Sequence, residues 1–225
     1  MPDMDFTGRP VIVVGAAGAL GAGLVAAFAE AGAAVTGVGR AVPAAGRQLA
    51  GVEYRTVDVL DDAALADLFA QGPPPWAVVN TVGGFAPRTP LSQLDPAELT
   101  GQLELNLVSA ALVTKHALAR MTPAGQGRIV HTASRAAVAT KGSGFAYSVS
   151  KLGVLHLVSM AAGEVRGTGI TVNCVVPSII DTPANRSAMP NADHASWPKI
   201  PDVARAYLFL ASPAARLVCG AAIPV

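Results

Sequence analysis

The sequence predicts an α/β fold with a single doubly wound domain, in which a seven-stranded parallel sheet carries helices on both faces. Short apolar runs alternate with helical patterns along all 225 residues. The runs are continuously apolar, as expected of strands buried on both faces. The length suits one domain with a full core, and we find no linker or internal repeat, so residues 1–225 are expected to form one dinucleotide-binding and catalytic unit.

The first part of the chain is expected to contain four strands and two helices. Strands are placed on the apolar runs at residues 10–14, 34–38, 52–57 and 76–80. A helix is expected at residues 19–31. Asp61 or Asp62 is expected to cap a second helix, because aspartate accepts hydrogen bonds from the first free backbone amides. A Gly-Pro-Pro-Pro segment at residues 72–75 separates that helix from the fourth strand.

The second part is expected to contain three strands and three helices. Asp95 and Pro96 favour a helix start, and this helix is expected to reach about Met121. Further helices are expected at residues 145–166 and 201–211, and strands at 128–132, 170–176 and 218–225. The irregular stretch 177–199 follows the end of a strand, where ligands of open α/β sheets bind. It is predicted to be a substrate lid, with an ordinary surface loop as the alternative.

Composition narrows the classes of partner. Charged residues make up 14% of the chain and the net charge is +1, so no nucleic-acid surface is indicated. The low charge suggests surface that is buried between subunits. The uncharged stretch 11–29 is long enough to span a membrane, but it is interrupted by glycines. It is better explained as a strand, a turn and a helix, and no membrane or targeting segment is expected.

The cysteines and histidines give no sign of a disulfide or a metal. Cys174 and Cys219 fall in strand-like segments and are expected to be reduced, buried thiols of a cytoplasmic protein. The spacing of metal ligands is absent from the histidines, which are His116, His131, His156 and His194. No metal site is therefore predicted.

A glycine-rich segment follows the first predicted strand and opens the first predicted helix. Residues 15–21 read Gly-Ala-Ala-Gly-Ala-Leu-Gly. Glycines here permit a tight turn and close backbone approach, and the amino end of the helix faces a pyrophosphate. In this context the pattern predicts a dinucleotide site in a Rossmann-type domain.

The choice of dinucleotide is expected to be made at the end of the second strand. NAD sites usually place an acidic residue there, whereas an arginine suits the 2′-phosphate of NADP. Between Glu30 and Glu53 the chain has no acidic residue, but it carries Arg40 and Arg47. NADP(H) is the predicted cofactor, with NAD(H) as the alternative if Arg40 is only a solvated loop residue.

Three residues form a candidate catalytic group. Tyr147 and Lys151 are four residues apart and share one face of a predicted helix. A neighbouring ammonium favours the phenolate, so the pKa of Tyr147 is expected to fall from about 10 toward neutrality. Ser134, at the end of an apolar strand, could hydrogen-bond the same substrate oxygen. The group predicts a tyrosine that exchanges a proton near physiological pH; the alternative is a surface tyrosine packed on a lysine stem.

Together these segments resemble the short-chain dehydrogenase/reductase family over nearly the whole chain. Ser134, Tyr147 and Lys151 match its catalytic trio in type and spacing, and Asn106 resembles the asparagine that supports its proton relay. The resemblance implies that the cofactor is bound by Gly15, Ala17, Gly18, Ala19, Leu20, Gly21, Arg40, Asp58, Val59, Asn80, Val82, Gly83, Tyr147, Lys151, Pro177, Ile180 and Thr182.

The resemblance implies an NADP-preferring oxidoreductase that reduces a carbonyl or oxidises an alcohol. Ser134 would hold the carbonyl oxygen and Tyr147 would protonate it. Lys151 would tune Tyr147 and bind the nicotinamide ribose, and Asn106 would tie a water chain to Lys151. The implied partners are a small-molecule substrate and a second copy of the chain. A homodimer or homotetramer is expected through the helices near 96–121 and 145–166.

Two alternatives stay open. The glycine loop and residues 181–193 are similar to those of dihydropteridine reductases, which implies activity on a quinonoid pterin. Ser134 and Arg40 depart from that group, which generally lacks the serine and carries an acidic residue for NADH. The second alternative is a non-catalytic dinucleotide sensor on the same fold. Such proteins commonly lose the tyrosine or the lysine, and both are present here.

Overall fold

The computed structural model describes residues 4–85, 89–138 and 144–225. Its strands form one seven-stranded parallel sheet in the order β3-β2-β1-β4-β5-β6-β7, which confirms the predicted fold. Because the order reverses between β1 and β4, a crevice opens at the carboxyl ends of these two strands. The strands are β1 (Pro10–Val14), β2 (Ala34–Gly39), β3 (Glu53–Thr56), β4 (Ala77–Asn80), β5 (Gly127–Thr132), β6 (Ile170–Val176) and β7 (Ala222–Pro224).

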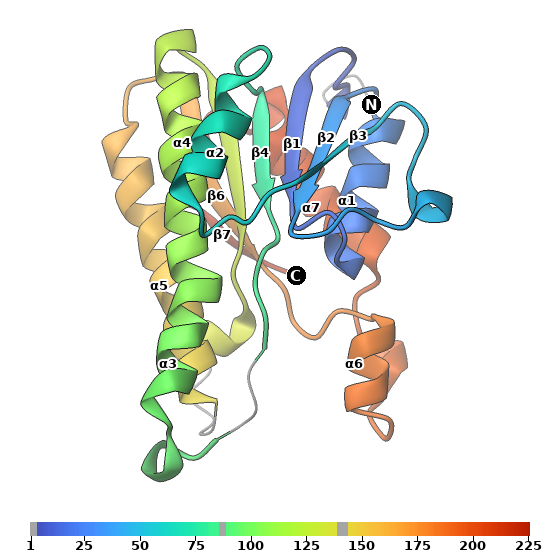
Figure 1. Cartoon of the computed structure of the whole chain (residues 1–225), viewed down its shortest axis with the longest axis vertical. Coiled ribbons are helices and arrows are strands. Elements are labelled where there is room, and N and C mark those ends of the chain that lie inside the picture. The colour runs from blue at the N-terminus through green and yellow to red at the C-terminus, as the bar shows by residue number, and fades with distance from the viewer. Residues whose placement is uncertain (1–3, 86–88, 139–143) are drawn as a thin grey trace.

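Helices cover both faces of the sheet (Figure 1). On one side lie α2 (Asp62–Ala70), α4 (Ser109–Ala124) and α5 (Phe145–Glu164), and on the other α1 (Ala19–Glu30) and α7 (Ile200–Ala211). Two apolar cores result, with Leu65 and Val113 buried on the first side and Phe28 and Leu210 on the second. Each such buried side chain contributes about 1.5–3 kcal/mol relative to exposure. The two cores hold the sheet rigid beneath the crevice.

The predicted helix from 96 to 121 is in fact three consecutive segments. They are α3 (Pro96–Leu103), a π-helical turn (Glu104–Val108) and α4. The π turn inserts an extra residue, a local change that apolar periodicity does not report and that is frequent at functional sites. The helix also runs past Met121, and ends only where Gly125 adopts φ 66°.

The segment before the last strand also departs from the prediction. β7 covers only Ala222–Pro224 rather than 218–225. Gly220 turns at φ 78°, and the Val218 carbonyl accepts a hydrogen bond from the Asn173 side chain instead of joining the ladder. Cys174 is buried as expected, but Cys219 lies in this turn and is exposed, so the prediction of two buried thiols was wrong for Cys219.

The stretch 177–199 is more regular than predicted. It contains α6 (Pro183–Ala188), which projects below the sheet in Figure 1. Thr182 caps α6 by accepting a hydrogen bond from the Asn185 amide, and Pro183 fits its first turn. Elsewhere, Asp61 rather than Asp62 caps α2, accepting from the amides of Ala63 and Ala64.

Among the described helices, only α5 is long and apolar enough to cross a membrane by length and composition. Val154 and Val158 on its inner face are buried in the core against the sheet. The same helix carries Tyr147 and the buried Lys151. α5 is therefore built as a core helix of an α/β fold.

Candidate active site

A cavity of about 300 Å³ lies at the carboxyl ends of β1, β2 and β4. Its wall combines the glycine turn after β1 with the loops that follow β2, β3 and β4. The lining residues are Gly15, Ala17, Gly18, Gly39, Arg40, Ala41, Val57, Asp58, Val59, Leu60, Thr81, Val82, Gly83, Leu105 and Ser109. Eight of the residues expected to bind the cofactor are among them.

Two glycines of this turn leave no space for a side chain. Gly15 has φ 91°, and a Cβ there would lie 2.4 Å from Thr81 Oγ1. A Cβ on Gly21 would lie 2.1 Å from the Gly15 carbonyl oxygen. Gly18 is the N-cap of α1, so the free amides of the first helical turn face the cavity. This cradle fits the diphosphate of a dinucleotide.

Three residues of the predicted loop act indirectly. Ala19, Leu20 and Gly21 form the first turn of α1 and do not line the cavity. Gly21 allows the turn to close on Gly15, and Leu20 packs toward the core that contains α1.

A second cavity of about 210 Å³ adjoins the first through Thr81 and Gly83, which line both. It brings together Ser134, Tyr147 and Lys151 from segments far apart in the sequence. Its lining residues are Thr81, Gly83, Gly84, Phe85, Thr132, Ala133, Ser134, Tyr147, Lys151, Pro177, Ser178, Ile180, Thr182 and Asn185.

The catalytic candidates are placed by one strand end and one helix. Ser134 follows β5 and caps a short 3₁₀ helix by accepting from the Ala136 amide. Tyr147 and Lys151 lie one turn apart on α5, as their spacing predicts. Lys151 is 4% exposed, and its ammonium donates to the Thr132 carbonyl oxygen at 2.9 Å.

The expected pKa of Tyr147 was wrong. Burial raises the pKa of Tyr147 above its usual value, and the neighbouring Ser134 hydroxyl offsets this only in part. Burial also lowers the pKa of Lys151 to about 8. Desolvation of the phenol therefore determines the direction of the pKa shift in this structure. The tyrosine is protonated at neutral pH, which is the form that donates a proton.

Asn106 lies in the π turn and is buried behind the second cavity rather than lining it. Its Oδ1 accepts from the Gly84 amide at 3.1 Å, and its Nδ2 donates to the Gly84 carbonyl at 3.2 Å. The Nδ2 also donates to Ser150 Oγ at 3.1 Å, beside Lys151. Asn106 thereby connects the loop after β4 to α5.

Asn80 is likewise buried and does not line either cavity. Its Oδ1 accepts a hydrogen bond from the Val82 amide at 3.0 Å. This contact shapes the turn 80–83, the wall that the two cavities share. Asn80 therefore acts on the cofactor site through the backbone.

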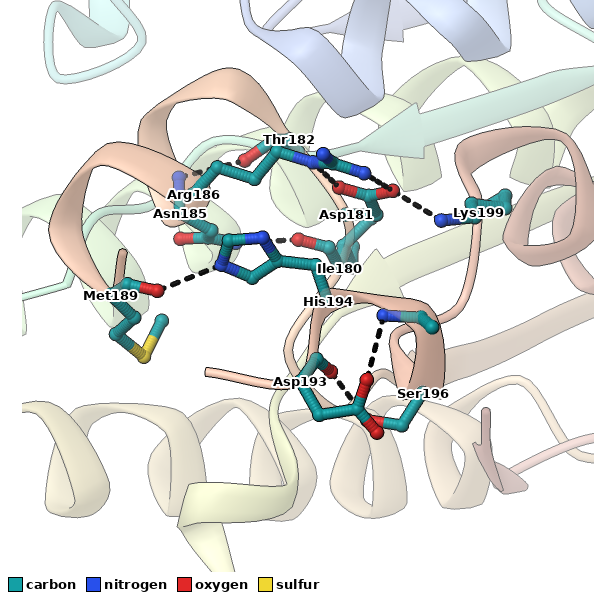
Figure 2. A network of polar contacts seen from close by, with 11 residues as sticks. Ile180, Asp181, Thr182, Asn185, Arg186, Met189, Asp193, His194, Ser196 and Lys199 are labelled. Atoms are coloured by element: carbon teal, nitrogen blue, oxygen red, sulfur yellow. Dashed lines mark hydrogen bonds and ion pairs between the residues drawn. The ribbon is translucent and has the colours of Figure 1, made fainter. Parts of the chain in front are cut away.

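The stretch 177–199, which was predicted to be a lid, is held by a charged network, shown in Figure 2. Arg186 donates to both carboxylate oxygens of Asp181, at 2.5 and 2.9 Å, and Lys199 pairs with the same carboxylate. These partners hold the pKa of Asp181 well below its usual range. Asp181 stands between Ile180 and Thr182, which both line the second cavity, so the network fixes one of its walls.

Met189, His194 and Trp197, in the stretch 177–199, contact one another and do not line the second cavity. His194 contacts the Met189 carbonyl through Nε2 at 2.8 Å, as Figure 2 shows. The rings of His194 and Trp197 lie 4.6 Å apart, and Trp197 is buried.

Several lining residues were not predicted. Asn185 is held by its hydrogen bond to the Ile180 carbonyl, and Ser178 directly follows the predicted Pro177. Leu105 lies in the π turn beside Asn106, Ser109 is the first residue of α4, and neither has a sequence signal of its own. Ser178 could have been predicted as a lining residue because it adjoins a motif. Leu105 and Ser109 could not, because the π turn that places them is not visible in the sequence.

Residues 15–225 match a family model described as enoyl-(acyl carrier protein) reductase. The chain is 36% identical to cis-4-hydroxycyclohexanecarboxylate dehydrogenase of Sinomonas cyclohexanicum, over 98% of this chain and 96% of the relative. It is 31% identical to D-threitol dehydrogenase of Mycolicibacterium smegmatis, over 97% and 92%. A short-chain type dehydrogenase/reductase from Mycobacterium ulcerans has a similar structure (TM-score 0.89, 28% identity, 98% and 89% covered).

A glycine cradle that opens into a serine, tyrosine and lysine pocket on a doubly wound sheet defines an oxidoreductase of the NAD(P)(H)-binding class. The chain belongs to the short-chain dehydrogenase/reductase family. The resemblance drawn from the sequence is thereby confirmed.

Proposed function

We propose that this protein is an NADP-preferring carbonyl reductase or alcohol dehydrogenase that uses Tyr147 as its acid and base. One observation carries the proposal: Ser134, Tyr147 and Lys151 line one cavity, which shares a wall with the dinucleotide cradle. A carbonyl in the second cavity would lie between the proton donor and the place where a nicotinamide enters from the first.

Each residue has a separate task in the proposed reaction. NADPH, when bound, supplies the hydride. Tyr147 donates its phenolic proton to the carbonyl oxygen and takes it back in alcohol oxidation. Ser134 donates a hydrogen bond to the same oxygen, where negative charge develops. Lys151 adds a positive charge beside the phenol, and its buried position makes that charge effective.

Asn106 is proposed to support proton replacement. Its side chain bonds Ser150, which precedes Lys151, and the backbone of Gly84 at the mouth of the second cavity. This position suits a residue that orders water between Lys151 and solvent.

The preference for NADP rests on Arg40. Among the residues that line the first cavity, the charged ones are Arg40 and Asp58. Arg40 directly follows β2, where a 2′-phosphate would lie. An arginine at this position pairs with a phosphate by charge-assisted hydrogen bonds.

The substrate is proposed to be a secondary alcohol or the corresponding ketone. The two full-length relatives described above are named as dehydrogenases of a hydroxylated cyclohexane ring and of a polyol. The apolar side of the second cavity, with Phe85, Pro177 and Ile180, favours a ring over a polyol.

The chain is further proposed to act in the cytoplasm as a homodimer or homotetramer, without nucleic-acid or membrane partners. The outer surface of the π turn and α5 carries exposed apolar side chains, namely Val108, Leu152 and Met160. Pairing of this surface with a second copy would bury them. Light scattering that finds a monomer at micromolar concentration would contradict the oligomer.

The experiment is a turnover panel with a matched cofactor titration. Consumption of NADPH should be observed with cyclic ketones, and NADPH should bind more tightly than NADH. Arg40→Ala should remove that difference while NADH binding is kept. Turnover of quinonoid dihydropterin alone would favour pteridine reduction, and tight NADPH binding without any turnover would favour a sensor.

A further inference from the structure

A buried histidine connects the sheet to the wall that the two cavities share. His131 lies on β5 beside Asn80 of β4 and is 1% exposed. Its Nδ1 is 3.4 Å from Asn80 Nδ2, and its Nε2 is 2.8 Å from Thr114 Oγ1 on α4. The proposed reaction gives His131 no task, although it is directly linked to a residue of the cofactor turn.

The hydrogen positions in the contacts between Thr114, His131 and Asn80 can be assigned by starting from Thr114. The Thr114 hydroxyl donates its only hydrogen to the Ala110 carbonyl at 2.8 Å. It must therefore accept from His131, so the imidazole carries its hydrogen on Nε2. Nδ1 is then an acceptor, and it receives a hydrogen bond from Asn80 Nδ2.

This direction fixes the amide of Asn80. With Nδ2 turned toward His131, Oδ1 faces the other way and accepts from the Val82 amide at 3.0 Å. A flipped amide would set Oδ1 against the lone pair of His131 and NH₂ against the Val82 N–H. The orientation of one side chain thus sets the turn 80–83, whose Thr81 and Gly83 line both cavities.

We propose that His131 is a positioning residue for dinucleotide binding: as a neutral acceptor it holds the Asn80 amide, and thereby the turn that forms the cofactor wall. The inference rests on the dinucleotide site of the proposed function. Burial, together with the charge of Lys151, lowers the pKa of His131 to about 4, which keeps the acceptor neutral at physiological pH.

Three substitutions of His131 test the roles of its two ring nitrogens separately. His131→Asn can place its Oδ1 near the position of Nδ1, which keeps the acceptor for Asn80. His131→Gln can place its amide near the position of Nε2, which keeps the donor to Thr114 and removes that acceptor. His131→Phe fills the space and removes both. Thr114→Val is the matched control, because it breaks the network at the end remote from the cofactor.

The dissociation constant of NADPH and the melting temperature are measured for every variant. We expect His131→Asn and Thr114→Val to bind NADPH within about twofold of the parent chain, although Thr114→Val loses stability. His131→Gln and His131→Phe should bind NADPH about tenfold more weakly. In both variants the buried Asn80 amide loses its acceptor, so that it reorients and displaces the turn 80–83.

Two results would overturn the inference. One is unchanged NADPH binding in His131→Gln, together with a melting temperature lowered as in Thr114→Val, which would make His131 structural only. The other is equal weakening in His131→Asn and His131→Gln, a comparison that holds even if His131→Phe does not fold. Failure of the parent chain to bind either dinucleotide would instead refute the proposed function.

Discussion

Lys151 is held by Thr132: its ammonium donates a hydrogen bond to the Thr132 carbonyl oxygen at 2.9 Å. The bond ties α5 to the end of β5, two residues before Ser134. A Cβ added to Gly83 would lie 2.7 Å from Lys151 Nζ and 2.5 Å from Asn106 Oδ1. The lysine is therefore held by one backbone carbonyl and packs closely against the backbone of Gly83.

Carbonyl reduction should weaken as the pH rises through about 8. Burial lowers the pKa of Lys151 to about 8 and raises that of Tyr147. Below that pH the lysine is charged and the phenol is protonated, which is the state that reduction requires. We expect kcat with NADPH and a cyclic ketone to fall above that pH, because the positive charge beside the phenol is lost. A reduction rate that is independent of pH on both sides of about 8 would contradict the role of Lys151.

Gly83→Ala should lower kcat by about tenfold or more. The added methyl group would displace the Asn106 oxygen or the Lys151 ammonium, both of which are buried. Gly101→Ala is a suitable control, because nothing lies within 4 Å of a Cβ there. Steady-state kinetics and thermal denaturation of both variants provide the check. Equal activity of the two would show that the space at Gly83 is not needed for catalysis.

Asp181→Asn should raise KM for the carbonyl substrate several-fold and weaken NADPH binding much less, because most of the expected cofactor contacts lie in the first cavity. The Asp181 side chain is 9% exposed and pairs with Arg186 and Lys199. Its removal loosens Ile180 and Thr182 at the substrate cavity but does not touch the glycine turn. Asp193→Asn is the control, because Asp193 only caps a short 3₁₀ turn farther along the lid. A change in NADPH affinity without a change in KM would argue against this role of the lid.

Phe85→Ala should change which ketones are used. The Phe85 ring is 64% exposed and lies edge-to-face against Tyr147, with centroids 5.2 Å apart. An apolar ring beside the proton donor offers a surface on which a cyclic substrate can pack. We expect kcat/KM to fall about tenfold for cyclic ketones and much less for small acyclic ketones. Leu217→Ala, at another exposed apolar residue, should change neither; an equal loss for both kinds of ketone would contradict selection by Phe85.

Local signals in the sequence were sufficient to predict the sheet and most of the residues that line the two cavities. The apolar runs placed all seven strands, and the glycine turn and the Tyr147–Lys151 spacing placed two walls of the cavities. These features depend on neighbouring residues, so they can be read from one sequence.

Features that depend on tertiary contacts could not be predicted. The π turn at Asn106 shifts one residue without altering the apolar pattern. The raised pKa of Tyr147 follows from burial, which a sequence does not give. The orientation of the Asn80 amide depends on its contact with His131, 51 residues later in the chain. Each of these is set by packing between elements that are remote in sequence.

The most direct test of the account is NADPH-dependent ketone reduction by Tyr147→Phe beside Tyr54→Phe. Removing the Tyr147 hydroxyl removes the proton donor, so kcat should fall by about 10²–10⁴-fold while NADPH binding is retained. Within the part of the chain that the structure describes, the Tyr54 hydroxyl has one hydrogen-bond partner, the Leu49 amide at 3.4 Å, and the Tyr54 variant should keep full activity. A Tyr147→Phe protein that reduces ketones at the parent rate would contradict the assignment of Tyr147 as the acid.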